Sequence, residues 1–229
     1  MLAIIPARAG SKRLPGKNAM LLNGKPMIAY SIELALAFKE VSQVIVSTDS
    51  EQIADIAKDY GIRVDELRPA HLSTDEAKSI EVFQYHIESL EMTGITHRTT
   101  LILQPTSPLR QLVDLVAAHD LMKKFNANSV ISYTKELHPV SWHRYISQDL
   151  KPEEVFHPNQ NPMPKTFYPN GAIYFVKTEL IKMGRLEDDT TKAYIMPRER
   201  SVDIDTMEDF RFAEFLLERG YASSNNTSL

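Results

Sequence analysis

Residues 2 to 18 read Leu-Ala-Ile-Ile-Pro-Ala-Arg-Ala-Gly-Ser-Lys-Arg-Leu-Pro-Gly-Lys-Asn, an apolar run that passes directly into a basic, glycine-containing loop. The apolar run is typical of a buried strand. Glycines let backbone N–H groups approach phosphate oxygens, while lysine and arginine neutralise negative charge. Because open α/β sheets bind ligands at the carboxyl ends of their strands, we interpret the loop as a polyanion site. A solvated basic turn is the alternative.

The loop matches neither of two familiar phosphate motifs. Five residues, and not four, separate Gly10 from Gly16-Lys17, and Asn18 stands where a Walker A motif has Ser or Thr. The three glycines of the dinucleotide fingerprint are also missing around Gly10. The loop therefore belongs to another type of nucleotide site, or to none.

The rest of the chain alternates between strand-like and helix-like segments. Strands are expected at residues 2–7, 43–48, 99–103, 129–134 and 171–177. Helices are expected at 26–38, 50–60, 76–91 and 113–125, and from Thr206 onward, where Thr206 and Asp209 form a capping box. This alternation predicts an α/β fold, a Rossmann-like, nucleotide-binding, three-layer domain with a mainly parallel sheet.

Residues 135–168 differ in composition from the rest of the chain, because they contain five prolines, three histidines and the single tryptophan. Val140, Trp142 and Phe156 lack an obvious intramolecular face there, so we interpret the segment as an inserted dimerisation arm. A long loop packed on its own domain is the alternative. The nucleotidyltransferase core then comprises residues 1–134 and 169–222, and the polar tail 223–229 is expected to be disordered.

Composition limits the class of protein. A net charge of -4 over 229 residues argues against a general nucleic-acid or anionic-membrane binder, so the N-terminal cations are a local feature. The chain has no cysteine, which excludes disulfides and thiolate chemistry. Neither a signal peptide nor an apolar run of membrane-spanning length is recognisable. We expect a soluble, cytoplasmic protein.

A pair of carboxylates follows late in the chain, in Val202-Asp203-Ile204-Asp205. In an extended segment alternate residues share a face, so Asp203 and Asp205 project together. Two convergent carboxylates suit magnesium, which commonly bridges protein acids to substrate phosphates. Two solvated acids at a strand end are the alternative.

Two further segments carry polar groups at strand ends. In Gln104-Pro-Thr-Ser-Pro-Leu-Arg110, the prolines hold a turn that presents hydrogen-bonding side chains, and Arg110 either binds a carboxylate or pins the turn. In residues 167–174, Asn170-Gly171 follows a proline and is typical of a turn that enters a strand. The seven histidines show no metal-ligand spacing, and no role is assigned to them.

Taken in this order, the four segments resemble the acylneuraminate cytidylyltransferases over most of residues 2 to 215. The resemblance implies that CTP reacts with a nine-carbon α-keto-acid sugar, whose anomeric hydroxyl attacks the α-phosphate and releases pyrophosphate. It also implies a Mg²⁺ cofactor and a homodimer. The general base is either Asp205 or a metal-bound water.

The resemblance assigns roles residue by residue. Arg8, Lys17 and Asp205 match catalytic positions, and Asp203 and Asp205 match the magnesium-binding acids. The substrate-binding positions are Ser11 and Lys12 in the loop, Asn18, Arg68 and Ser79 at the cytidine, and Gln104, Thr106, Ser107 and Tyr174 along the sugar pocket. Phosphoryl transfer depends on in-line positioning and charge stabilisation, so no protein nucleophile is required.

This chain departs from the sialic-acid members beside the sugar site. It has Gln160 and Lys165 where they carry an arginine ahead of the Asn170-Gly171 segment, and Tyr168 where they often have another arginine. A legionaminic-type or other modified nonulosonate is therefore also considered. A metal-dependent glycosyltransferase and a catalytically inactive nucleotide-binding regulator are the competing functions.

Overall fold

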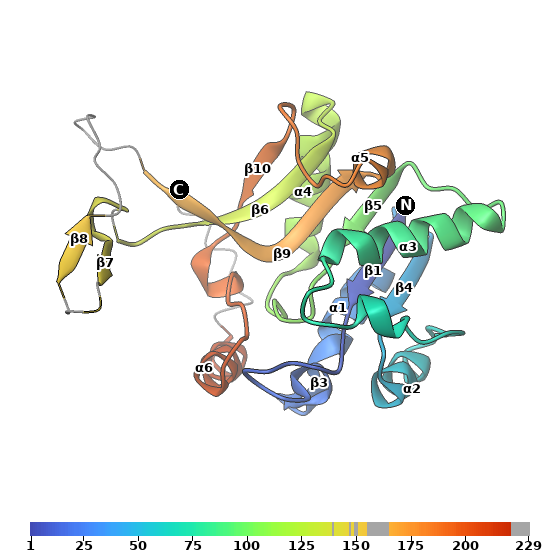
Figure 1. Cartoon of the computed structure of the whole chain (residues 1–229), viewed down its shortest axis with the longest axis horizontal. Helices are drawn as coiled ribbons and strands as arrows, with labels where there is room; N and C mark the ends of the chain where they lie inside the picture. The colour runs from blue at the N-terminus through green and yellow to red at the C-terminus, as the bar shows by residue number, and fades with distance from the viewer. Residues whose placement is uncertain (139, 147, 149–150, 155–164, 221–229) are drawn as a thin grey trace.

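The computed structural model describes residues 1–138, 140–146, 148, 151–154 and 165–220. A six-stranded sheet in the order β10-β6-β9-β5-β1-β4 forms its centre (Figure 1). The strands are β1 (Leu2–Pro6), β4 (Gln43–Ser47), β5 (Thr99–Ile102), β6 (Ser129–Lys135), β9 (Phe167–Lys177) and β10 (Lys192–Ile195). Only β9 runs against the others, so the predicted mainly parallel sheet is confirmed.

Helices cover both faces of this sheet because the strands are apolar on both sides. Ala3 and Ile5 of β1 pack with α1 (Met27–Ala37), α2 (Glu51–Asp59) and α4 (Leu112–Phe125). Leu2 and Ile4 point the other way, toward α3 (Ser79–Met92) and α5 (Thr178–Lys182). The three-layer α/β architecture is therefore confirmed, with a hydrophobic core on each face.

A smaller apolar cluster lies beyond the carboxyl ends of the strands. There α6 (Met207–Glu218) packs against the basic loop and the short pair β2 (Leu21–Leu22) and β3 (Lys25–Pro26), and Leu14, Leu22 and Ile204 are buried together. Thr206 accepts a hydrogen bond from Asp209 N, as the predicted capping box requires. This cluster brings the first loop of the chain to the late acidic segment.

The segment between β6 and β9 extends away from the sheet at one side of the molecule (Figure 1). β6 and β9 remain paired as far as Lys135 and Phe167. The described part of the excursion contains the turn η3 (Val140–Trp142) and a two-stranded sheet of β7 (Arg144–Ile146) and β8 (Pro152–Glu154). Phe156, Gln160 and the tail 223–229 lie outside the described residues.

Several sequence-based boundaries were wrong. The third helix begins at Ser79 and not at Glu76, with Lys78 as its N-cap. β9 begins at Phe167, so Asn170-Gly171 lies inside a long strand and is not a turn that precedes one. β10 had not been predicted, because four residues with alternating burial give a weak strand signal. Within the described range, no helix combines the length and apolar character needed to span a bilayer.

Candidate functional site

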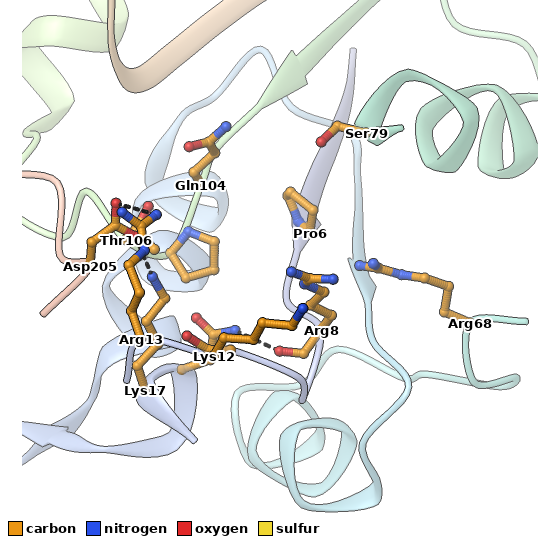
Figure 2. A pocket seen from close by; sticks show the side chains of 13 residues that line it. Pro6, Arg8, Lys12, Arg13, Lys17, Arg68, Ser79, Gln104, Thr106 and Asp205 are labelled. Atoms are coloured by element: carbon orange, nitrogen blue, oxygen red, sulfur yellow. Dashed lines mark hydrogen bonds and ion pairs between the residues drawn. The ribbon is translucent and has the colours of Figure 1, made fainter. Parts of the chain in front are cut away.

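A cleft of about 450 Å³ opens at the carboxyl ends of β1, β4 and β5, where the parallel strands predict a ligand site (Figure 2). Five cations line it, opposed by a single lining carboxylate, that of Asp205. The complete lining is Pro6, Arg8, Ser11, Lys12, Arg13, Lys17, Asn18, Arg68, Ser79, Gln104, Pro105, Thr106 and Asp205. This excess of positive charge suits a polyanion the size of a nucleotide.

The basic loop reaches the cleft through a sharp turn at Gly16. Gly16 has a φ of 68°, a left-handed conformation that costs glycine little, and it directs the chain into the short helix η1 (Lys17–Ala19). Lys17 is consequently buried, and its ammonium donates to the Ile204 carbonyl at 2.7 Å. The loop holds its last cation at a fixed position.

The acidic segment lies against the Gln104 turn. Ile204 is fully buried and donates its backbone N–H to the Thr106 carbonyl at 2.7 Å, which fixes the segment. Asp205 accepts ion pairs from Lys17 at 3.0 Å and from Arg13 at 2.7 Å (Figure 2). Asp203 is an exposed residue, yet desolvation of its carboxyl group raises the pKa of that group. A hydrogen bond with Thr106 lowers this pKa, and the nearby Asp205 charge raises it further.

Two cations of the loop are paired with Asp75, which the sequence had not singled out. Arg8 and Lys12 contact opposite oxygens of its carboxylate at 3.0 and 2.5 Å, and Arg8 also donates to the Thr74 carbonyl. The two cations lower the pKa of Asp75, and Lys12 has a larger effect on it than Arg8. The carboxylate of Asp75 thus partly neutralises two of the cations that line the cleft.

Arg110 pins the Gln104 turn, which resolves the alternative left open by the sequence. Its guanidinium donates to the carbonyls of Gln104 and Ser107 at 2.7 and 2.6 Å, and it also contacts the Ser31 hydroxyl. Burial lowers its pKa to about 9. Arg110 therefore shapes the turn from behind and does not face the cleft.

The Asn170-Gly171 pair forms an irregularity inside β9, where the pairing with β6 shifts register between Ile131 and Tyr133. Asn170 is buried, accepts from the Ser132 hydroxyl at 2.6 Å and donates to the Ser201 hydroxyl at 2.8 Å. The pair thereby links β6 to the chain that leads into the acidic segment.

The structure brings together ten of the thirteen residues assigned to the site, and all ten line the cleft. Ser107, Tyr174 and Asp203 do not line it. Ser107 is fully buried and donates to the Asn170 carbonyl, so its hydroxyl supports the wall and does not face a substrate. Burial, and then the nearby Asp203 charge, raise the pKa of Tyr174, which places its phenol near the acidic segment.

Sequence reasoning assigned no function to two groups in contact with the site, Asp75 and the pair Ser47–His86. Their contacts join residues more than thirty positions apart, so no local pattern marks them. The described residues contain no cluster of three metal-ligating side chains. Asp203 and Asp205 are the residues of the acidic segment that could contribute oxygen ligands to a magnesium ion.

Fold and cleft together define a Rossmann-like α/β protein with a nucleotide-sized cationic site. Comparison with known sequences narrows this class. A cytidylyltransferase family model matches residues 2–222. The chain therefore belongs to the cytidylyltransferase family.

Three curated relatives align along nearly all of this chain. A CMP-N,N'-diacetyllegionaminic acid synthase of Legionella pneumophila is 38% identical, over 95% of this chain and 96% of its own. An N-acylneuraminate cytidylyltransferase of Escherichia coli is 35% identical, over 93% of this chain and 51% of its own. A pseudaminic acid cytidylyltransferase of Campylobacter jejuni is 31% identical, over 97% of this chain and 98% of its own.

A solved structure shares the fold at low sequence identity. It is a CMP:2-keto-3-deoxy-manno-octonic acid synthetase complexed with CTP, which superposes with a TM-score of 0.69 and 17% identity over 95% of this chain and 98% of its own. This likeness supports the assignment of the sheet and its flanking helices.

Proposed function

We propose that the protein joins CTP to a nonulosonic acid, a sialic acid or a relative of it, and releases pyrophosphate. The observation that carries the proposal is the set of five cations around one cleft, two of which are ion-paired with Asp205 of the acidic segment. The curated relatives, named as synthases of CMP-legionaminic acid and as cytidylyltransferases for neuraminic and pseudaminic acids, support the substrate class.

In this reaction the anomeric hydroxyl of the sugar forms a bond to the α-phosphorus, while the bond from that phosphorus to the β-phosphate oxygen breaks. Pyrophosphate leaves with the electron pair, and the hydroxyl proton passes to a base, either Asp205 or a water molecule. Arg8 and Lys17 both line the cleft, at separate points of its wall, and stabilise the charge that develops on the phosphate oxygens (Figure 2).

Asp203 and Asp205 are proposed to hold Mg²⁺, which supplies charge neutralisation at the triphosphate. Burial chiefly raises the pKa of Asp203 and the nearby Asp205 charge raises it further, so a bound cation would stabilise the charged form of both carboxylates. Arg13 now occupies one oxygen of Asp205, but its side chain is 69% exposed and free to swing toward the phosphates.

The decisive experiment measures pyrophosphate release with Mg²⁺, CTP and a panel of keto-acid sugars: N-acetylneuraminic, diacetyllegionaminic and pseudaminic acids, with an octulosonic acid as the comparison. Turnover with at least one nonulosonic acid, and preference for CTP over UTP, is expected. No turnover with any sugar would refute the proposal. Sugar transfer from a CMP-sugar without use of CTP would favour the glycosyltransferase alternative. CTP binding without formation of any product would favour the inactive regulator.

The arm between β6 and β9 is proposed to pack on a second copy of the chain. Trp142 and Ile146 are 69% and 63% exposed in the single chain. Because Lys135 and Phe167 are paired, a two-residue Asn-Gly turn can join them and replace the arm. Sedimentation of that deletion variant is expected to give a monomer; an unchanged dimer would contradict the proposal. A Met92→Ser variant, altered at an exposed apolar residue of α3, is the control.

A further inference from the structure

We propose that Ser47 and His86 are positioning residues that hold Arg68 in the nucleotide cleft. The inference rests on the proposed function, in which Arg68 contacts the nucleoside part of CTP. It concerns two side chains that do not line the cleft themselves, at the end of β4 and in the middle of α3.

Arg68 is fixed almost entirely through β4. Its Nε donates to the Ser47 hydroxyl at 2.9 Å, its Nη2 donates to the Ser47 carbonyl at 2.5 Å, and its backbone N–H donates to the Thr48 carbonyl at 2.6 Å. The residue is only 7% exposed. Within the described part of the chain Nη1 makes no hydrogen bond, so this nitrogen is available to a ligand in the cleft.

Ser47 is in turn held by His86. The His86 Nε2 lies 2.6 Å from the Ser47 hydroxyl oxygen. Burial, and then the positive charge of Arg68, lower the pKa of His86 to about 4, so the imidazole is neutral near pH 7. The guanidinium donates to the Ser47 oxygen, and its charge favours a hydroxyl proton that points away from it. Ser47 therefore donates to Nε2, and the proton of His86 resides on Nδ1.

The relay connects two walls of the cleft. His86 and Ser79 both belong to α3, and Ser79 lines the cleft. Arg68 approaches the cleft on the side of the view opposite Asp205, where the phosphates react in the proposed mechanism (Figure 2). An arginine in this position binds the nucleotide equally in the ground state and the transition state. Loss of its support is therefore expected to raise the KM for CTP and leave kcat unchanged.

The test compares His86→Leu with His86→Gln, since glutamine retains a hydrogen-bond acceptor for Ser47 and leucine does not. We expect His86→Leu to raise the KM for CTP about tenfold, the effect of weakening one hydrogen bond to a charged group. His86→Gln should restore most of this loss, with kcat unchanged in both variants. The matched control is His97→Leu, which removes the 2.9 Å contact of another histidine with Gln43, at the opposite end of β4.

Two outcomes would overturn the relay. One is an unchanged KM for CTP in a folded His86→Leu variant. The other is that His86→Leu raises this KM by the same factor in an Arg68→Ala background, where a relay through Arg68 predicts no further effect. If the variant does not fold, ¹⁵N NMR of the wild type tests the proposal instead. In that spectrum His86 Nε2 must be unprotonated and Nδ1 protonated. The opposite tautomer also overturns the proposal. Absence of CTP turnover in the wild type would instead refute the proposed function, while the NMR result stands independently.

Discussion

The Lys17 ammonium lies 3.0 Å from Asp205 Oδ1, although 188 positions separate the two residues. The same ammonium donates to the Ile204 carbonyl at 2.7 Å, so it is fixed by two acceptors of the acidic segment. Its side chain is only 11% exposed. The first loop and the late acids consequently form one rigid unit, and Lys17 is held in place before a nucleotide enters.

Replacement of Lys17 by alanine should therefore depress turnover strongly. A preorganised cation in a partly buried site stabilises developing charge by about 3–4 kcal/mol, which corresponds to a fall in kcat of about 10²–10³-fold. Steady-state pyrophosphate release with CTP and an accepted sugar measures the effect. Lys39→Ala, at an exposed residue just after α1, is the control. Wild-type activity in Lys17→Ala would refute the catalytic role.

Asp205→Asn should lower kcat by a similar order and raise the Mg²⁺ concentration needed for half-maximal activity. The amide keeps the size of the side chain but removes one of the two charges that attract the ion. CTP binding should change less than turnover, because the loss of the carboxylate charge also releases the exposed Arg13 toward the phosphates. Titration of Mg²⁺ in activity assays measures this, with exposed Asp189→Asn as the control. An unaltered Mg²⁺ requirement would contradict the metal-binding role.

The sequence predicted the central architecture and most of the cleft because both depend on local order. Strand–helix alternation places every parallel strand end at one edge, so residues that follow β1, β4 and β5 must converge there. Arg8 and Gln104 were found in this way, whereas Asp205 was found from its alternation with Asp203 in an extended segment.

The missed features depend on contacts that no local pattern encodes. Asp75 forms its ion pair with Arg8 although the two residues are 67 positions apart, and the neighbouring Thr74 accepts a hydrogen bond from the same arginine. Asn170-Gly171 has the composition of a turn, yet Asn170 is satisfied by Ser132 and Ser201 from distant elements, and the backbone continues as a strand. Tertiary hydrogen bonds overrode the local turn signal.

Gly171→Ala is expected to weaken sugar use more than it weakens folding. Gly171 has a φ of +73°, and a Cβ there would lie 2.9 Å from Gln104 Oε1 in the proposed sugar pocket, so the amide must shift. Gly184 has a similar φ of +75°, but the nearest atom to its Cβ would be 3.9 Å away, at Gln84. Both alanines should cost about 1–2 kcal/mol in unfolding free energy from backbone strain. Only Gly171→Ala should raise the KM for the sugar; an equal KM in the two variants would contradict the role of Gln104.

Asp75→Asn should lower the KM for CTP. Arg8 and Lys12 are paired with the Asp75 carboxylate, which the triphosphate must displace before it can bind both cations. Because the pair is solvent-exposed and screened, the gain should be less than about tenfold and should shrink at high salt. CTP titrations at two ionic strengths measure it. Asp65→Asn, which removes the exposed pair with Arg63, is the control, and a raised KM in Asp75→Asn would show that Asp75 assists binding.

His86 should make the stability of the protein dependent on pH in the acid range. Its pKa falls from 6.5 to about 4 on folding, so between these values the unfolded chain binds more protons and stability decreases as the pH falls. At pH 4.5 this single group is expected to cost about 2.5 kcal/mol relative to pH 7. His86→Gln removes the titration, so urea unfolding at the two pH values should show a smaller acid loss for the variant than for the wild type. His71→Gln, at an exposed histidine, is the control. Parallel pH profiles of wild type and His86→Gln would show that folding does not lower the pKa of His86, which would contradict a buried imidazole kept neutral beside Arg68.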